Sequence, residues 1–232
     1  QRVAEGAAMM TDTEVSRRIV GAAYPRHFNR PIALAMDENI QNVGLPIWSE
    51  NDQQYALALQ ELVGSEEKKG LATELIGIGE PLENPVSGGS DDIGDVSWNV
   101  PTVTLRFPSN VGGLQGHHWS SAMAMATPIA HKGAVTGAKV IATTMIDLLQ
   151  DGTLVEEAHS YFDNIQTAEE QYVSFVGPDD TPAIEKNAEI MAQFRPLLEE
   201  FYFDSARYDT YLEQLGIDYP QLEPSSIQAG QK

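Results

Sequence analysis

The chain has 232 residues, with 14 Lys and Arg against 34 Asp and Glu, and a formal net charge of −20. Such an acidic surface repels nucleic acids and anionic membranes, so both are excluded as partners. The chain has no Cys, which excludes disulfides and thiolate metal sites. Any transition-metal site must therefore use His and carboxylates, a donor set that suits zinc or another divalent first-row metal.

The composition fits a soluble globular protein with one substantial core or two modest ones. Hydrophobic residues make up 42% of the chain and charged residues 21%. The apolar runs are too short to span a bilayer, and no apolar leader follows a basic start. The first residue is Gln within a helix-like pattern, so we expect a processed or truncated piece of something longer. Whether it is cytoplasmic or exported stays open.

The first quarter of the chain predicts helices and one strand. Residues 1–10 read as the end of a helix, and residues 13–20 alternate as a strand does. Residues 29–44 predict a helix with Asn29 as its N-cap and Gly44 as its stop, and residues 49–64 repeat this pattern from Ser49. The expected packing residues of the two helices are Met36, Ile40, Val43, Tyr55, Leu59 and Leu62.

Further along, two irregular stretches surround a second predicted strand. Residues 65–97 and 108–121 lack periodicity, while residues 101–107 ("PTVTLRF") have the β-branched composition of a strand. Residues 132–152 predict a long helix, packed through Val135, Ala138, Ala142, Met145 and Leu149. Beyond Gly152 we expect three helices that form a C-terminal extension. Helices that alternate with strands favour an α/β fold.

The chain has five histidines: His27, His117, His118, His131 and His159. His117 and His118 follow a Gly-rich loop, and adjacent residues of an extended segment point to opposite sides. His131 precedes the long predicted helix, where the helix dipole favours the neutral imidazole that binds metal or accepts a proton. A packed or surface role is as good an interpretation for His117 and His131, and a better one for His27 and His159.

The stretch "GGSDDIGDVSW" places Asp91, Asp92 and Asp95 within five residues. Like charges this close repel unless water, a cation or hydrogen-bond donors accept them. The neighbouring glycines would let the backbone approach a ligand, and Ser97 and Trp98 lead towards the predicted strand, where α/β proteins often place their sites. A solvated acidic turn remains an equal interpretation.

Several motifs together resemble a known enzyme family. They are "MTDTEV", "MDENIQNVGLPIWSENDQQYALALQ", "GGSDDIGDVSWNVPTV", "GHHWS" and "IAHKGAVTGAKVIA", in order. The chain is identified as similar to p-aminobenzoyl-glutamate hydrolase-like amidohydrolases of the di-zinc aminoacylase and carboxypeptidase family of metallopeptidases. The similarity runs from about Val3 to Leu149.

The resemblance implies a fold and a division of the chain. Residues 1–26 would be the end of a small α+β lid domain, which also forms a homodimer. Residues 27–152 would be the C-terminal part of an α/β catalytic domain, and residues 153–232 would be the helical extension. The family's His-x-Asp motif and Glu-Glu pair, which supply most metal ligands and the general base, are absent here. The missing N-terminal half is therefore an expected partner.

The resemblance also implies roles for individual residues. His117 matches the His of an H-x-W motif and His131 the His of "AHKG". We expect His117 as a metal ligand, and His131 as a ligand or as a catalytic and substrate contact. Asp92 matches a loop aspartate expected to contact substrate and assist catalysis, and Asp95 and Ser97 would support it or bind substrate.

The expected function is hydrolysis of the amide bond of a small N-acyl amino acid, such as p-aminobenzoyl-glutamate, by metal-activated water. The expected cofactor is a pair of divalent metals, zinc or alternatively manganese or cobalt, held mostly by residues absent from this chain. We therefore expect the chain to be inactive without its N-terminal half. The alternative is a non-catalytic interaction or regulatory module derived from such an enzyme. A cation-buffering protein is a poorer fit, since no Ca²⁺-loop spacing occurs.

Overall fold

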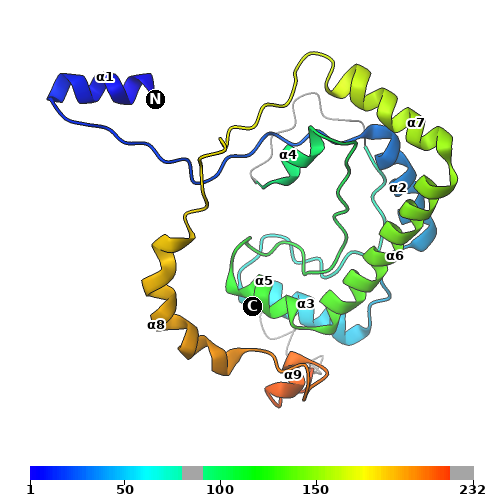
Figure 1. Ribbon diagram of the computed structural model, residues 1–232. Helices are drawn as coiled ribbons and strands as arrows, with labels where there is room; N and C mark the ends of the chain where they lie inside the picture. Colours follow the sequence, from blue (N-terminus) through cyan, green and yellow to red (C-terminus); the bar gives the residue numbers. More distant parts are fainter. Residues whose placement is uncertain (80–90, 220–232) are drawn as a thin grey trace.

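The computed structural model describes residues 1–79 and 91–219, and Figure 1 shows most of the helices arranged in a ring. The helices of the N-terminal half are α1 (Arg2–Thr11), α2 (Arg30–Val43), α3 (Glu50–Leu62), α4 (Ile93–Ser97) and α5 (Trp119–Met125). They are followed by α6 (Pro128–Gln150), α7 (Gly152–Tyr161), the π-helix η1 (Phe162–Gln166), η2 (Ile184–Asn187), α8 (Ala188–Leu198), η3 (Glu199–Phe201) and α9 (Tyr211–Gln214).

Helices α2 and α3 confirm the capping signals in the sequence. The Asn29 side chain accepts a hydrogen bond from the Ile32 N–H at 3.3 Å, and Gly44 ends α2 with a positive φ of 76°. Ser49 and Asp52 form a capping box at the start of α3, each accepting from the backbone N–H of the other. These bonds satisfy donors that a helix start leaves without partners, so both boundaries could be predicted locally.

The hydrophobic core lies where α3, α5 and the start of α6 meet. Its buried members are Ala56, Leu59, Leu71, Val111, Ala124 and Ile129. The buried amide of Gln60 fastens two irregular segments to this core, since it donates to the carbonyls of Gly70 and Gly112 at 3.3 and 2.8 Å. Leu62, expected in the core, is instead 69% exposed at the end of α3.

A second packed group joins α2, α6 and α7. Asn39 on α2 donates to the Thr144 hydroxyl on α6 at 3.3 Å, and fully buried Asn29 donates to the Ala158 carbonyl on α7 at 2.9 Å. Buried amides of this kind fix how the helices are aligned, because an unpaired buried donor is unfavourable. Helix α7, the first helix of the expected C-terminal extension, therefore packs on the main body.

The two predicted strands do not pair with any strand among the described residues. Residues 13–20 and 101–107 carry no strand assignment, and neither does any other residue within 1–79 and 91–219. A strand needs a neighbouring backbone for its N–H and C=O groups, and the sequence pattern cannot supply that neighbour. The described residues give no support for strand pairing, and the α/β fold class stays a prediction.

Helix α6 differs from the prediction in its first residue and in the face that it buries. It begins at Pro128, four residues before the predicted start, because Pro is accommodated in the first helical turn. Its buried residues are Ile129, Gly133, Gly137, Val140 and Thr144, whereas the predicted packing face is exposed. Val135, Met145 and Leu149 are 59%, 57% and 84% exposed.

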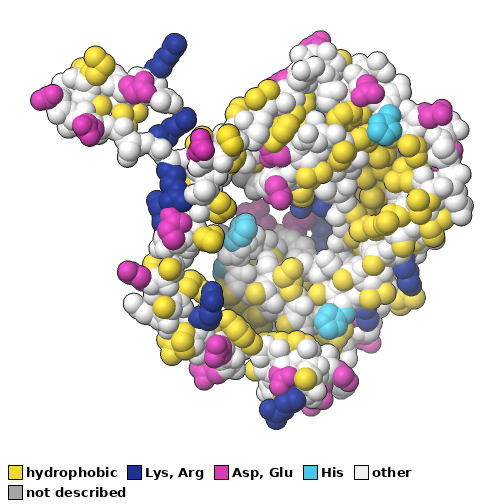
Figure 2. All heavy atoms as spheres, viewed as in Figure 1, with side chains coloured by type: hydrophobic (Ala, Val, Ile, Leu, Met, Phe, Trp, Pro, Cys, Tyr) yellow, Lys and Arg dark blue, Asp and Glu magenta, His cyan; other side chains and the backbone are white. Residues whose placement is uncertain are grey.

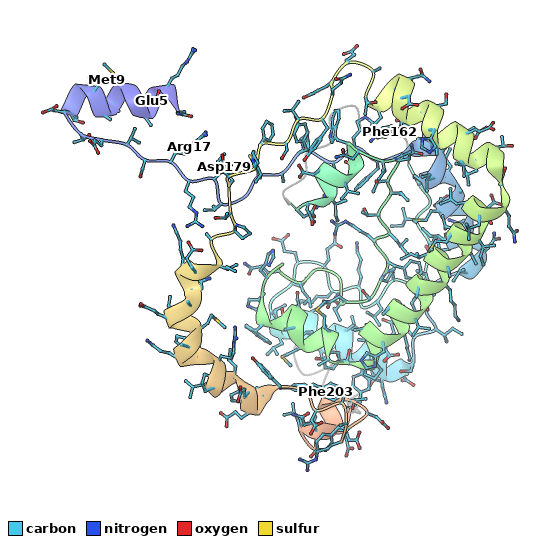
Figure 3. The ribbon with its side chains drawn as sticks, in the orientation of Figure 1. Glu5, Met9, Arg17, Phe162, Asp179 and Phe203 are labelled. Carbon is cyan, nitrogen blue, oxygen red and sulfur yellow. The ribbon has the colours of Figure 1, made fainter. Side chains whose placement is uncertain are left out.

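Helix α1 lies apart from the rest of the chain, with no buried residue. Figure 3 shows Glu5 and Met9 on this isolated helix. The chain then returns through residues 13–20 to the C-terminal segment, where Arg18 pairs with Glu185 and donates to the carbonyl of Pro182 at 3.2 Å. No helix among the described residues combines the length and the apolar content needed to cross a membrane.

Candidate functional site

The acidic stretch continues into a short helix held against residues 24–27. Gly88, Gly89 and Ser90, which begin this stretch, lie outside the described residues. A Cβ added to Gly94 would lie 1.8 Å from the Tyr24 carbonyl oxygen, so this close backbone approach requires glycine. The Trp98 indole donates to the Pro25 carbonyl at 2.8 Å and closes the far end of the contact.

Asp91 and Asp95 have partners that the sequence pattern did not reveal: a cation for Asp91 and hydrogen-bond donors for Asp95. Asp91 pairs with Arg26, whose Nε donates to Oδ1 at 3.2 Å, and it also accepts from the Ile93 N–H at the start of α4. Asp95 accepts from the Tyr24 N–H at 3.2 Å and from the Tyr172 hydroxyl at 2.9 Å. Both carboxylates therefore hold α4 in place, although they were grouped with Asp92 in the sequence.

Ser97 is fully buried, with its hydroxyl donating to the Gly94 carbonyl at 2.7 Å and accepting from the His27 N–H at 3.1 Å. The Gln166 amide donates to the carbonyls of Ser97 and His27 at 2.6 and 2.7 Å, so η1 packs beneath α4. His27 Nδ1 is buried without a described partner, and burial lowers the pKa of this imidazole. Its position is that of a packed histidine.

Asp92 differs from its acidic neighbours because its side chain is exposed. It stands at the N-cap position of α4 without a capping hydrogen bond. No described residue forms an ion pair with its carboxylate. Of the three aspartates, it is the one whose carboxylate remains open to an incoming group.

His117 and His118 are adjacent but have different surroundings. His118 caps α5: its Nδ1 lies 2.8 Å from the Ser120 hydroxyl and accepts from the Ser120 N–H. His117 has a positive φ of 56°, a left-handed conformation that non-glycine residues rarely adopt. Residues in this region occur in turns as well as at functional positions. His117 therefore lies in a turn and not in the extended segment that the sequence pattern implied.

His131 lies in the first turn of α6 and is exposed. It lines a pocket of about 400 Å³ together with Pro128, Glu213 and Tyr219. The next residue, Lys132, forms an ion pair with Asp52, whose side chain is 1% exposed. Burial alone would raise the pKa of Asp52, but Lys132 and the Ser49 groups outweigh it and lower that pKa.

Tyr219 brings the C-terminal segment to this region. Its ring lies 5.6 Å from that of Tyr55 on α3, and burial together with the charge of Asp52 raises the pKa of its hydroxyl. Residues 210–219 therefore cover one side of the first turn of α6, where His131 is exposed.

The predicted site residues do not form a complete metal site. Within residues 1–79 and 91–219, no group of three or more His, Asp or Glu side chains is close enough to hold a metal ion. No described contact joins Asp92, His117 and His131, and α4 and α5 lie on opposite sides of the centre in Figure 1. Figure 2 shows the molecule hollowed between them.

Comparison with known proteins relates the chain to part of a hydrolase. It is similar to a subunit of the p-aminobenzoyl-glutamate hydrolase of Escherichia coli (strain K12), with 29% identity over 178 residues. The match covers 67% of this chain and 37% of that relative, so the chain spans little more than a third of the relative's length. No family model matches the chain. No solved structure matches it either. The similarity supports an enzyme-related role of the amidohydrolase type.

Proposed function

We propose that this chain is part of a metal-dependent amidohydrolase that cleaves the amide bond of a small N-acyl amino acid of the p-aminobenzoyl-glutamate kind. Water would add to the amide carbonyl, giving a carboxylic acid and a free amine. The similarity to a p-aminobenzoyl-glutamate hydrolase subunit is the observation that carries this proposal. The exposed carboxylate of Asp92 and the left-handed backbone at His117 support it.

The described residues do not hold a metal by themselves, so the proposal assigns them a share of the site. His117 would donate one imidazole, and the remaining ligands would come from a further polypeptide, the N-terminal half of the same enzyme. Divalent metals, when bound at such sites, polarise carbonyl groups and acidify water. Zinc fits an imidazole and carboxylate donor set, as do manganese and cobalt.

Within this chain, Asp92 and His131 would orient the substrate. Asp92 stands on a short helix that Asp91, Asp95 and Ser97 fasten to residues 24–27, so its carboxylate is carried on a fixed support. His131 would hydrogen-bond the substrate or stabilise negative charge on the amide oxygen. An active site shared between two polypeptides explains why the side chains of Asp92, His117 and His131 have no partner among the described residues.

The test is reconstitution. The chain is co-expressed with the N-terminal part of the p-aminobenzoyl-glutamate hydrolase subunit that it resembles, and release of p-aminobenzoate from N-(p-aminobenzoyl)-glutamate is measured beside bound metal. We expect metal and turnover only in the combined protein, with turnover reduced at least 100-fold by His117→Ala or Asp92→Asn. His159→Ala and Asp179→Asn, both at exposed positions, serve as matched controls.

Turnover by the isolated chain equal to that of the combined protein would contradict the shared site. The alternative, a non-catalytic interaction module, is favoured by the absence of a metal-binding group among the described residues. It predicts a combined protein with no bound divalent metal and no hydrolysis, and that result would replace the enzymatic proposal.

A further inference from the structure

Positive charge is scarce in this chain, with 14 Lys and Arg against 34 Asp and Glu. Lys132, Lys139 and His131 nevertheless line one groove, and no carboxylate among the described residues lines it. The groove has a volume of about 620 Å³, within the range of about 300–1,000 Å³ that is usual for small-molecule sites. Its lining therefore favours an anion, although the chain as a whole repels anions.

One wall of the groove is a side of α6. His131, Val135 and Lys139 follow one another at intervals of four residues, so they share one side of the helix. This side differs from the glycine face of α6, which packs on the body. Val135 is 59% exposed and brings an apolar side chain to the middle of the wall. The wall thus places a cation beside an apolar surface.

The opposite wall is the turn that follows α2. Val43 and residues 45–47 line it, and all four are apolar. Pro46 is buried and so anchors the turn, whereas Ile47 is 90% exposed. Because Ile47 lines the groove, a ligand with an apolar body would remove its side chain from water, which is favourable.

Lys139 supplies the charge that decides the class of ligand. The ammonium group of Lys132 pairs with the buried carboxylate of Asp52, so its charge is already balanced. No described residue forms an ion pair or a hydrogen bond with the side chain of Lys139. One free ammonium group beside two apolar walls matches a ligand that has one negative charge and an apolar body.

We propose that this groove binds a small organic anion, a monocarboxylate whose body is an aromatic ring or a similar apolar group. Its carboxylate accepts hydrogen bonds from the Lys139 ammonium group, and its body lies between Val135 and Ile47. His131 lies about two turns earlier on α6, about 12 Å away along the helix axis. An anion held at Lys139 therefore leaves His131 free for its proposed substrate contact, and the groove binds the anion whether or not the chain takes part in hydrolysis.

Other occupants match the groove less well. Inorganic phosphate offers nothing apolar to Val135 and Ile47, and these side chains would remove water from it without replacing the lost hydrogen bonds. A neutral apolar molecule would leave the Lys139 ammonium group beside it without a counter-charge. A second copy of this chain would be repelled, because each copy carries a net charge of −20. A carboxylate with an apolar body satisfies both the charge and the walls.

Binding is tested on the 232-residue chain in EDTA and without substrate. Isothermal titration calorimetry compares benzoate with benzamide, which has the same shape without the charge, and with acetate and inorganic phosphate, which are charged but lack the ring. We expect one benzoate to bind per chain, and each of the other compounds to bind at least about tenfold more weakly. Nuclear Overhauser effects between the benzoate ring protons and the methyl groups of Val135 and Ile47 locate the bound anion.

Two variants test the groove, and each has a matched control. Lys139→Gln removes the free ammonium group, and Val135→Asp places a negative charge on the apolar wall. Each should weaken benzoate binding at least about fivefold. The controls are Lys186→Gln, at another exposed lysine, and Met145→Asp, at a similarly exposed position of α6 that does not line the groove. Both controls should bind benzoate within about twofold of the wild-type affinity.

Circular dichroism shows whether each variant keeps its helices, and where one does not, the contacts of benzoate in the wild-type chain decide. No saturable binding, equal affinity for benzamide or acetate, or ring contacts away from Val135 and Ile47 would each overturn the anion site. Equal effects of the variants and their controls would do the same, as would binding that requires an added metal. A reconstituted protein without hydrolysis would leave the anion site in place and overturn the proposed function alone.

Discussion

Asp91, Asp92 and Asp95 lie within five residues of one another, yet the folded chain gives them different surroundings. Arg26 neutralises Asp91, and Tyr24 and Tyr172 donate to Asp95, while Asp92 stays exposed. The sequence marks the acidic stretch as unusual but cannot say which carboxylate is left open, because the partners lie 65 and 77 positions away along the chain.

Gly94 is the residue on which the placement of this stretch depends. Gly94→Ala would push a methyl group to 1.8 Å from the Tyr24 carbonyl oxygen, so α4 must move. We expect a loss of about 1–3 kcal/mol in the free energy of unfolding, measured by urea denaturation followed by circular dichroism.

Gly112→Ala is the matched control, because nothing lies within 4 Å of a Cβ at that position. An equal effect of the two substitutions would mean that the close contact with Tyr24 does not matter.

The buried Asp52 gives a prediction for pH. Its folded-state pKa is lowered, so the Lys132–Asp52 pair adds stability above the ordinary pKa of about 4, and that stability is lost as the pH falls through the folded-state pKa. Asp52→Asn should cost about 2–3 kcal/mol at pH 7, less than a fully buried pair because Lys132 is 36% exposed.

The urea midpoint measured from pH 7 to pH 3 checks this prediction, and the variant should show a flatter profile. The exposed pair of Lys68 and Glu61 offers a control: Glu61→Gln should change stability by under about 1 kcal/mol. Parallel pH profiles for wild type and Asp52→Asn would contradict the assignment.

At the scale of elements, α6 presses on the extended segment through two glycines of different tolerance. A Cβ at Gly133 would lie 2.1 Å from the Pro108 carbonyl oxygen, whereas one at Gly137 would lie 3.3 Å from the Phe107 Cβ. Because Ala is favoured over Gly in a helix by about 1 kcal/mol, Gly137→Ala should be near neutral. Gly133→Ala should be clearly destabilising.

Thermal unfolding followed by circular dichroism compares the two variants. A reversed order would show that α6 and segment 101–107 are not packed as described.

The helices also show which features sequence patterns can predict. The caps of α2 and α3 are local hydrogen bonds between residues three apart, so the positions of Asn29 and Ser49 in the sequence were enough to predict them. The predicted packing face of α6 was wrong. The apolar stripe of α6 was expected to face the body, whereas the face that carries Gly133 and Gly137 does so. Two apolar faces of one helix cannot be ranked by periodicity, and the closer approach that glycine permits decided between them.

At the scale of the whole molecule, charge opposes compactness. With a net charge of −20, mutual repulsion acts across the chain, and it is screened as the Debye length falls from about 30 Å at 0.01 M salt to about 8 Å at 0.15 M. We expect the urea midpoint at pH 7 to rise with added NaCl.

The same titration at pH 5, closer to the sequence pI of about 4.4, should show a smaller slope with salt. Equal slopes at the two pH values would mean that net charge is not the cause.

The sequence by itself determined the capped helices α2 and α3, the absence of thiol chemistry, the acidic surface and the similarity to a hydrolase subunit. These follow from local hydrogen bonds, composition and residue identity, none of which requires distant contacts. Only the tertiary structure decided that Asp92 is the exposed one of the three clustered aspartates, that His117 has a left-handed backbone while His118 caps α5, and that segment 101–107 pairs with no strand among the described residues. Each of those outcomes depends on which distant backbone or side chain lies alongside, and folding in three dimensions sets that.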